Sequence, residues 1–147
     1  VQLSGISGPL PGDRVAVTRN PCLHPGDVRI LQVVTAPPHL AHLHDVIVFP
    51  SHGPRPHQDE CAGGDTDGDQ YWIFWDPRLI PATQIEPLSF PVAKATLLPR
   101  TLHVSDLTAF FVAYMRNADL GMLCNAHRVW ADQAGDGASC AQCKLLA

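Results

Sequence analysis

Apolar and polar side chains alternate along four short stretches in the first half of the chain, at residues 14–19, 28–35, 45–49 and 70–75. The apolar positions are mostly valine, isoleucine and aromatic residues. A period of two with these residue types is typical of β-strands. Long, proline-marked loops join the stretches, without a sustained helical pattern between them. The pattern therefore predicts a compact β-barrel-like unit and argues against βαβ winding.

Helical spacing replaces this alternation in the second half of the chain. Residues 77–104 are rich in proline and have no sustained period, so we expect a connecting loop or lid there. Ser105 is a suitable N-cap for a helix over residues 106–115, residues 119–133 predict a second helix, and a third is expected to start within residues 138–147. The apolar residues at helical spacing are interpreted as facing a core: Leu107, Phe110, Phe111 and Tyr114 in the first helix, and Leu120, Leu123 and Trp130 in the second.

These patterns predict an α+β chain in three parts: a barrel-like unit at residues 1–76, a connecting loop at 77–104 and a truncated helical segment at 105–147. A length of 147 residues with 46% hydrophobic content suits one buried core. The chain begins at Val1 without an initiator methionine, and it has no leader or apolar run long enough to span a membrane. We therefore expect a piece of a longer soluble, intracellular protein, cytoplasmic or nuclear, with no membrane partner.

Charge and cysteine content narrow the functional classes. The net charge of −4 does not indicate a nucleic-acid surface. A basic groove for nucleic acid would have to lie mostly outside this sequence. Five cysteines are an odd number, and without a secretory signal they favour reduced thiols over a disulfide framework.

The stretch that carries candidate chemistry is a glycine-rich loop at residues 63–69, in which Asp65, Asp67 and Asp69 occupy alternate positions. On a straight strand these residues would be about 6.7 Å apart per step. The ligands of one Mg²⁺ all lie about 2.1 Å from the ion, so the backbone must curl. Glycines before the first aspartate and before the last supply the freedom to do so. Three carboxylates this close would repel one another without a cation, so the loop predicts a divalent-metal site.

Two other interpretations of this loop remain open. Acidic, glycine-rich loops are often solvated turns. An EF-hand loop beginning at Asp65 would place oxygen ligands at several of the required positions. However, Gln70 stands where that loop needs glycine, and residues 71–75 are strand-like where it needs a helix.

Cysteine and histidine residues form a second constellation with the spacing of a tetrahedral zinc site. Its members are Cys124, His127, Cys140 and Cys143. The alternative is buried free cysteines and a hydrogen-bonded histidine within a helix. His39, His42 and His44 also cluster, but they flank a proline turn without an evident fourth ligand, and surface histidines are the simpler interpretation.

Several motifs together resemble the eukaryotic RNA-dependent RNA polymerases of RNA silencing. They are residues 19–29 (Arg-Asn-Pro-Cys-Leu-His-Pro-Gly-Asp-Val-Arg), 42–50, 53–57 and the aspartate loop at 63–69, continued by Trp75-Asp76, Asn125-Ala126-His127 and Ala131-Asp132. The resemblance extends from about Val15 to Leu146. The pairing of the first segment with the aspartate loop is highly specific.

The resemblance implies a fold and a chemistry. The fold is one of two double-psi β-barrels, distantly similar to the large catalytic subunit of multisubunit RNA polymerases, followed by helices. The chemistry is Mg²⁺-dependent, template-directed RNA synthesis that makes double-stranded RNA, with Mn²⁺ as an alternative ion, and with Asp65, Asp67 and Asp69 as catalytic, metal-binding residues. The implied partners are template RNA, nucleoside triphosphates, the remainder of the polymerase chain with its second barrel, and proteins of the silencing pathway.

The resemblance also implies substrate-binding residues. Arg19 belongs to an Arg-x-Pro-x-Leu-His segment and is the candidate for contacting the incoming nucleotide or the 3′-terminal ribose. His24 ends that segment and either contacts substrate or holds its own loop by hydrogen bonds. Arg29 and Arg55 are weaker candidates for phosphate contacts.

The sequence departs from the related patterns in two places. Gly63 stands where multisubunit enzymes have asparagine, so sugar discrimination by that side chain does not carry over, and Thr66 replaces a residue that is usually large and apolar. The second barrel and its basic residues are missing, so the piece alone is expected to be inactive. Two rivals stay open: a fragment of a DNA-dependent RNA polymerase large subunit, which asparagine at position 63 would have favoured, and a non-catalytic metal-binding or interaction module, against which the three intact aspartates count.

Overall fold

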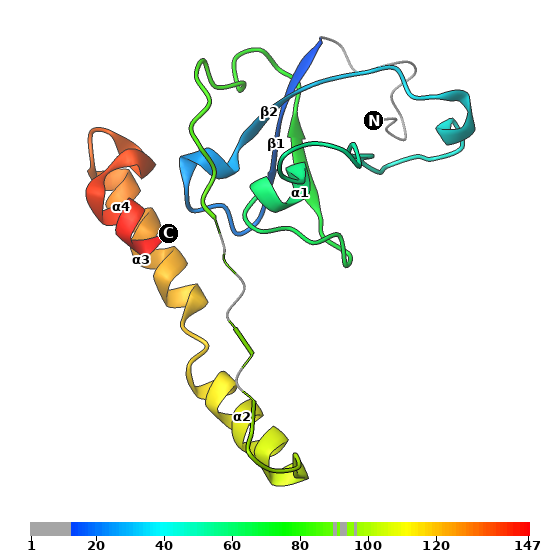
Figure 1. The fold of residues 1–147 in the computed structure, drawn as a ribbon. Helices are drawn as coiled ribbons and strands as arrows, with labels where there is room; N and C mark the ends of the chain where they lie inside the picture. The colour runs from blue at the N-terminus through cyan, green and yellow to red at the C-terminus, as the bar shows by residue number, and fades with distance from the viewer. Residues whose placement is uncertain (1–12, 90, 92–93, 96) are drawn as a thin grey trace. The chain divides into compact units, whose positions relative to one another are not determined.

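The structure is a computed structural model that describes residues 13–89, 91, 94–95 and 97–147 (Figure 1). The chain divides into two compact units, one within residues 1–89 and one within residues 90–146, and each is described by itself. Residues 1–12 of the expected barrel-like unit, and parts of the expected connecting loop, lie outside the described residues.

An antiparallel sheet organises the first unit. Its strands are β1 (Arg14–Arg19), β2 (Arg29–Gln32) and β3 (Tyr71–Phe74), in the order β2-β1-β3. Val15 lies opposite Leu31, and Val17 lies opposite Ile73. The valines of β1 are buried together with Cys61, and apolar side chains of both neighbouring strands pack around them. The strands predicted at residues 14–19 and 70–75 are confirmed, and the one predicted at 28–35 is present in shortened form.

The prediction of a strand at residues 45–49 is wrong, because these residues adopt no regular secondary structure. The alternation that suggested it is still visible in the packing. Ile47 and Phe49 pack against the core, whereas Val46 and Val48 are 43% and 56% exposed. A strand also needs a neighbouring backbone for its hydrogen bonds, and no described residue supplies one to residues 46–49.

Short helical turns complete the first unit. They are the 3₁₀ turns η1 (Pro25–Asp27) and η2 (Pro38–Leu40) and the single-turn helix α1 (His57–Glu60). With the helices of the second unit, they confirm the α+β class for the described part of the chain.

Helices make up the second unit: α2 (Val104–Arg116), α3 (Leu120–Gln133), the 3₁₀ turn η3 (Gly137–Ser139) and α4 (Ala141–Leu146). The three predicted helices are therefore present. Ser105 is not the N-cap, because α2 begins one residue before it. His103 precedes the helix, and its backbone N–H donates to the Asp106 carboxylate at 2.9 Å, while Arg100 forms an ion pair with the same carboxylate. No helix among the described residues is long and apolar enough to cross a membrane.

The apolar stripes expected to face a core are exposed instead. This is so for Leu107, Phe110, Phe111 and Tyr114 of α2 and for Leu120, Leu123 and Trp130 of α3. Among the described elements, α3 packs mainly against η3 and α4, where His127, Cys140 and Cys143 are buried, and α2 packs extensively against none. The amphipathic spacing correctly predicts the helices, but the surface that it would cover is not supplied by the described residues.

Candidate metal centre

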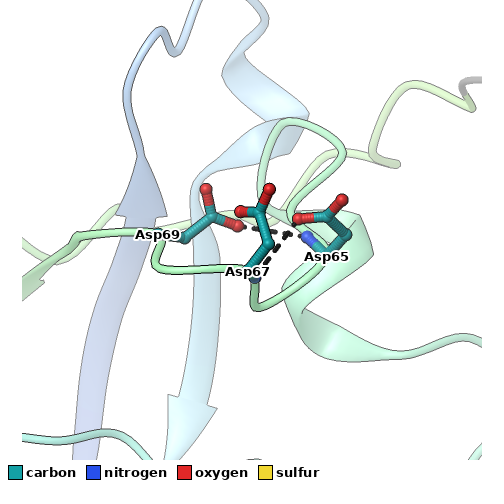
Figure 2. A group of neighbouring side chains, drawn as sticks. All are labelled: Asp65, Asp67 and Asp69. Carbon is teal, nitrogen blue, oxygen red and sulfur yellow. Dashed lines mark hydrogen bonds between the residues drawn. The ribbon is translucent and has the colours of Figure 1, made fainter.

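The three aspartates of the loop converge between α1 and β3. Asp65, Asp67 and Asp69 each offer a carboxylate oxygen, and these oxygens lie within 4.8 Å of one another (Figure 2). The backbone curls as the spacing required, with positive φ angles of 67° at Gly63, 67° at Thr66 and 120° at Gly68. Thr66 is a β-branched residue in a left-handed conformation, so the loop holds backbone strain beside the carboxylates.

Asp69 organises this loop from within. Its Oδ2 accepts a hydrogen bond from the backbone N–H of Asp65 at 3.1 Å (Figure 2). The same oxygen accepts the N–H of Thr66 at 3.3 Å, and Oδ1 accepts a hydrogen bond from Arg19 at 3.0 Å. The Asp69 side chain is 10% exposed. Asp65 and Asp67 are exposed, and Asp65 Oδ1 accepts the N–H of Asp67 at 3.4 Å. The triad thus combines one anchored carboxylate with two that face solvent.

Arg19 connects the sheet to the aspartate loop. It is the last residue of β1, and its guanidinium donates to Asp69 and, at 2.8 Å, to the carbonyl oxygen of Ala62. The side chain of Arg19 remains 22% exposed. One planar guanidinium therefore holds both ends of the loop against the end of a buried strand.

The aspartate loop is closely packed at Gly64, where a side chain and a backbone oxygen from other parts of the unit approach the loop backbone. A Cβ atom at Gly64 would lie 2.5 Å from the Tyr71 hydroxyl, 2.7 Å from the Gln58 carbonyl oxygen and 3.2 Å from Asp69 Oδ2. Gly64 also donates its N–H to Gln58 at 3.1 Å. Burial, together with the charge of Asp69, raises the pKa of Tyr71 to about 12, so its hydroxyl stays protonated. Only glycine fits at position 64.

His24 shapes the turn after β1. Its Nδ1 accepts the backbone N–H of Gly26 at 3.1 Å, so His24 caps the N-terminal end of η1. A side chain at Gly26 would collide with the backbone carbonyl of Glu86, so the segment that follows β3 approaches this turn closely. The loop-holding interaction considered for His24 is present, and a contact of His24 with substrate stays a prediction.

Arg29 and Arg55 are both bonded within the first unit. Arg29 is buried, donates to the carbonyl oxygens of Gly26 and Ile85, and forms an ion pair with Glu60 at 3.3 Å. Arg55 forms an ion pair with Asp59 and donates to the carbonyl oxygen of Leu88 at 2.7 Å. These bonds give both guanidinium groups a scaffolding role. Their contact with phosphate stays a prediction.

The second ligand constellation does not converge in this way. Among the described residues, the aspartate triad is the group whose candidate ligand atoms all lie within 4.8 Å of one another. Neither of the two other predicted clusters comes together in this way: Cys124, His127, Cys140 and Cys143, and His39, His42 and His44. Cys143 instead donates its thiol to the His127 carbonyl oxygen at 3.4 Å, and its own N–H bonds to Cys140 Sγ. The EF-hand interpretation is wrong, because the strand β3 follows the loop.

Sequence reasoning missed three contributors to the site. Tyr71 and the carbonyl oxygens of Gln58 and Ala62 form the floor and one wall of the aspartate loop. The pair Gly63-Gly64 indicates backbone freedom, but nothing in the spacing indicates that Gly64 also makes room for a tyrosine hydroxyl. These contacts depend on where Tyr71 and the Gln58 carbonyl oxygen lie around Gly64 in the folded chain, which a linear pattern does not encode.

We expect metal affinity at the triad to rise with pH. A hydrogen bond with Asp65, and then repulsion from Asp65 and Asp69, raise the pKa of Asp67 above its usual value. Because its pKa is raised, the Asp67 carboxyl group binds a proton more tightly in the metal-free folded state than in the unfolded chain. The contribution of this group to the free energy of unfolding therefore falls as pH rises through the raised pKa. A bound cation reverses the balance, because it requires the deprotonated form. Titration of Mn²⁺ followed by electron paramagnetic resonance, from about pH 4 to about pH 7, should show this rise and then a plateau; a flat profile would contradict it.

The fold and the site define the class of protein: an α+β chain that holds three carboxylates on a curled loop, in the arrangement of a divalent-metal centre. Comparison with known families places it more closely. Residues 5–147 match the family model described as RNA dependent RNA polymerase. The chain therefore belongs to the RNA-dependent RNA polymerase family, and the resemblance found in its motifs is confirmed.

Curated relatives agree with this assignment. The chain is 44% identical over 135 residues to RNA-dependent RNA polymerase 6 of Arabidopsis thaliana, covering 90% of this chain and 11% of the relative. It is 42% identical over 134 residues to the probable RNA-dependent RNA polymerase 1 of Oryza sativa subsp. japonica, covering 91% and 18%. It is 42% identical over 118 residues to RNA-dependent RNA polymerase 1 of Schizosaccharomyces pombe, covering 78% and 10%. The chain thus spans between 10 and 18% of the length of these relatives.

Proposed function

We propose that this chain is part of the catalytic region of an RNA-directed RNA polymerase that copies template RNA into double-stranded RNA for RNA silencing. Nucleoside triphosphates and template RNA are the substrates, and the reaction is nucleotidyl transfer inside the cell, in the cytoplasm or nucleus. The observation that carries the proposal is the convergence of Asp65, Asp67 and Asp69 in a chain of this family.

The donor set fits a hard divalent cation. Carboxylate oxygens are the ligands that Mg²⁺ prefers, and two ligands of one ion, each about 2.1 Å from it, lie at most about 4.2 Å apart. The triad oxygens lie within 4.8 Å of one another, so a small closure of the two exposed side chains brings all three into range. Mn²⁺ takes similar oxygen ligands and is the proposed alternative ion.

In this proposal the chain's own residues position and neutralise charge. Mg²⁺ at the triad would activate the 3′-hydroxyl of the growing RNA and, with a second ion brought by the nucleotide, stabilise the departing pyrophosphate. Asp69, held by Arg19 and by the loop amides, sets the geometry to which the exposed Asp65 and Asp67 close. The partly exposed Arg19 faces the same site and is the proposed contact for the incoming nucleotide or the terminal ribose.

The surrounding residues have supporting roles. We propose that His24 contacts substrate from the turn that it holds, and that Arg29 and Arg55 mainly fix this turn and the segment before the aspartate loop, with phosphate contact as a weaker alternative. The sheet is the proposed core of a double-psi β-barrel within residues 1–76, followed by a connecting loop at 77–104 and a helical segment at 105–147.

The proposed setting is a longer polymerase chain, which supplies a second barrel with basic residues opposite the metal. The short span of this chain relative to its relatives supports that setting. Proteins of the silencing pathway are further proposed partners. The 147 residues alone are not expected to synthesise RNA.

The experiment that tests the function is RNA synthesis by the polymerase chain that carries this segment, on a single-stranded template with and without a primer. Labelled double-stranded product is expected with Mg²⁺ or Mn²⁺, and none is expected after chelation of divalent ions. Failure to make product under every metal condition, with template binding retained, would support a non-catalytic binding module instead. Equal synthesis from RNA and from duplex DNA templates would point to the DNA-dependent class.

A further inference from the structure

The hydroxyl of Tyr71 is a buried hydrogen-bond donor that has no partner among the described residues. The tyrosine ring packs edge-to-face against Phe49, with the ring centroids 5.3 Å apart, and it belongs to the side chains around the core of the first unit. The strand β3 and this core therefore hold the hydroxyl in place. A buried donor without an acceptor costs free energy, so its presence beside the aspartate loop indicates a role in another state of the site.

The carboxylate of Asp69 is the acceptor that lies beside this hydroxyl. A Cβ atom at Gly64 would lie 2.5 Å from the hydroxyl and 3.2 Å from Asp69 Oδ2, so both atoms border the same small space. The Gln58 carbonyl oxygen borders it too, at 2.7 Å, but it already accepts the N–H groups of Cys61 and Gly64, each at 3.1 Å. Because a carbonyl oxygen has two lone pairs, its capacity is used, and Asp69 remains as the acceptor.

The donors that now bond to Asp69 Oδ2 belong to the loop itself. They are the N–H groups of Asp65 and Thr66, at 3.1 and 3.3 Å. Hydrogen bonds to a carboxylate are usually about 2.7–2.9 Å long, so these two are weak. Both amides belong to the loop segment that carries the side chains expected to close on a cation, whereas Tyr71 is held in β3. The hydroxyl is therefore the donor that keeps its place while the loop closes.

We propose that Tyr71 is a positioning residue of the metal centre: with a divalent cation at the triad, its hydroxyl donates to Asp69 Oδ2 and holds this carboxylate towards the ion. Carboxylates that bind metals are themselves hydrogen-bonded by neighbouring groups, which fix their orientation. Arg19 already donates to Oδ1, so the two donors fix both oxygens of Asp69 and leave the remaining lone pairs to the ion. This inference rests on the proposed function in one respect, which is that the triad binds a cation.

This role predicts opposite effects of removing the hydroxyl in the two states of the site. Without metal, the change removes a buried donor that has no acceptor, so the stability of the protein should not fall. With metal, the change removes a hydrogen bond to a ligand, so the affinity for the cation should fall. A tyrosine with a purely structural role would instead lower the stability of the metal-free protein.

Titration of Mn²⁺ into the intact polymerase chain, followed by electron paramagnetic resonance, tests the proposal. Asp67→Asn, which removes one ligand of the triad, defines the signal from any other sites. Tyr71→Phe is expected to raise the Mn²⁺ dissociation constant at the triad by about 10-fold or more. In the presence of a chelator, this variant should have an unchanged or higher urea midpoint, and the amides of residues 63–74 should exchange no faster than in the wild type.

Two further variants serve as matched controls. Tyr114→Phe removes the hydroxyl of the other tyrosine in the sequence, which is 65% exposed on α2, and it should change neither Mn²⁺ affinity nor stability. p-Aminophenylalanine in place of Tyr71 keeps an N–H donor at the same end of the ring. It should restore most of the Mn²⁺ affinity that Tyr71→Phe loses.

Three results would overturn the proposal: unchanged Mn²⁺ affinity in Tyr71→Phe, lower stability of this variant in chelator, or no restored affinity with p-aminophenylalanine. The second result would give the hydroxyl a purely structural role, as a bond to the buried side-chain oxygen of Gln58 would. The proposed function is judged separately, by Asp67→Asn. If that variant binds Mn²⁺ as the wild type does, the triad is not the metal site and both proposals fall. If it loses the Mn²⁺ and Tyr71→Phe does not weaken binding, only this inference falls.

Discussion

Replacing Asp67 with asparagine in the polymerase chain is expected to lower the rate of RNA synthesis by about 10³-fold or more, which corresponds to about 4 kcal/mol of lost transition-state stabilisation. Asp67 is an exposed member of the triad, and its charge is held beside those of Asp65 and Asp69. The amide keeps the shape of the side chain but removes the charge that a cation requires. Primer extension under saturating Mg²⁺ measures the loss, and a filter-binding assay with template RNA should show that RNA binding survives.

The matched control for this variant is Asp136→Asn. Asp136 is an exposed carboxylate outside the triad, so the same chemical change there should leave the rate of synthesis within about two-fold, as is usual for surface substitutions. If the Asp67 variant retained the wild-type rate, the triad would not be the metal site. Loss of RNA binding together with synthesis would indicate misfolding and would call for titration of Mn²⁺ before any conclusion about catalysis.

The second large effect is expected from Gly64→Ala. The new methyl group would lie 2.5 Å from the Tyr71 hydroxyl and 2.7 Å from a backbone oxygen, so the aspartate loop must move. Overpacking of this kind costs about 1–3 kcal/mol. A displacement of about 1 Å at a catalytic group costs about 10²-fold in rate. We therefore expect a lower denaturation midpoint, weaker Mn²⁺ binding and RNA synthesis reduced by that factor.

Gly121→Ala is the matched control for the glycine variant. A Cβ atom at Gly121 meets nothing within 4 Å, and its backbone is not in the left-handed region. Alanine there, within α3, should leave stability, metal binding and synthesis unchanged or slightly improved. Wild-type Mn²⁺ affinity in the Gly64 variant would mean that the close approach of Tyr71 and Gln58 does not set the position of the carboxylates.

The sequence alone predicted the strands and helices whose signal is local. The alternation of residues 14–19 and the helical spacing of residues 119–133 correspond to β1 and α3, because each pattern depends on the burial of one face of a single element. The strand predicted at residues 45–49 was wrong for a different reason. The side-chain pattern there is that of a strand, but a strand also depends on a backbone partner. The predicted burial of the apolar face of α2 was wrong for a similar reason. Amphipathic spacing indicates that one face of a helix is to be covered, but it does not indicate which element covers it.

The candidate site shows a similar division. The identity of the three aspartates and the need for a curled backbone could be predicted, because the distance between alternate residues of a strand excludes a common ligand sphere. The pairing of Arg19 with Asp69 could not, because it joins residues far apart in the sequence through a contact set by the sheet register. The burial of Arg29 was also out of reach, since its carbonyl partners come from a segment without any periodic pattern.

The guanidinium of Arg19 has a consequence for how freely the rest of the first unit can vary. It is separated by 43 residues from Ala62 and by 50 from Asp69, yet it joins β1 to both through single hydrogen bonds. The position of the triad is thus set by this short connection rather than by the long excursion of chain in between. Closing a longer loop costs only about 0.6 kcal/mol for each doubling of its length. Insertions and deletions at the exposed tip of that excursion, near η2, can therefore accumulate while the geometry of the metal centre stays unchanged.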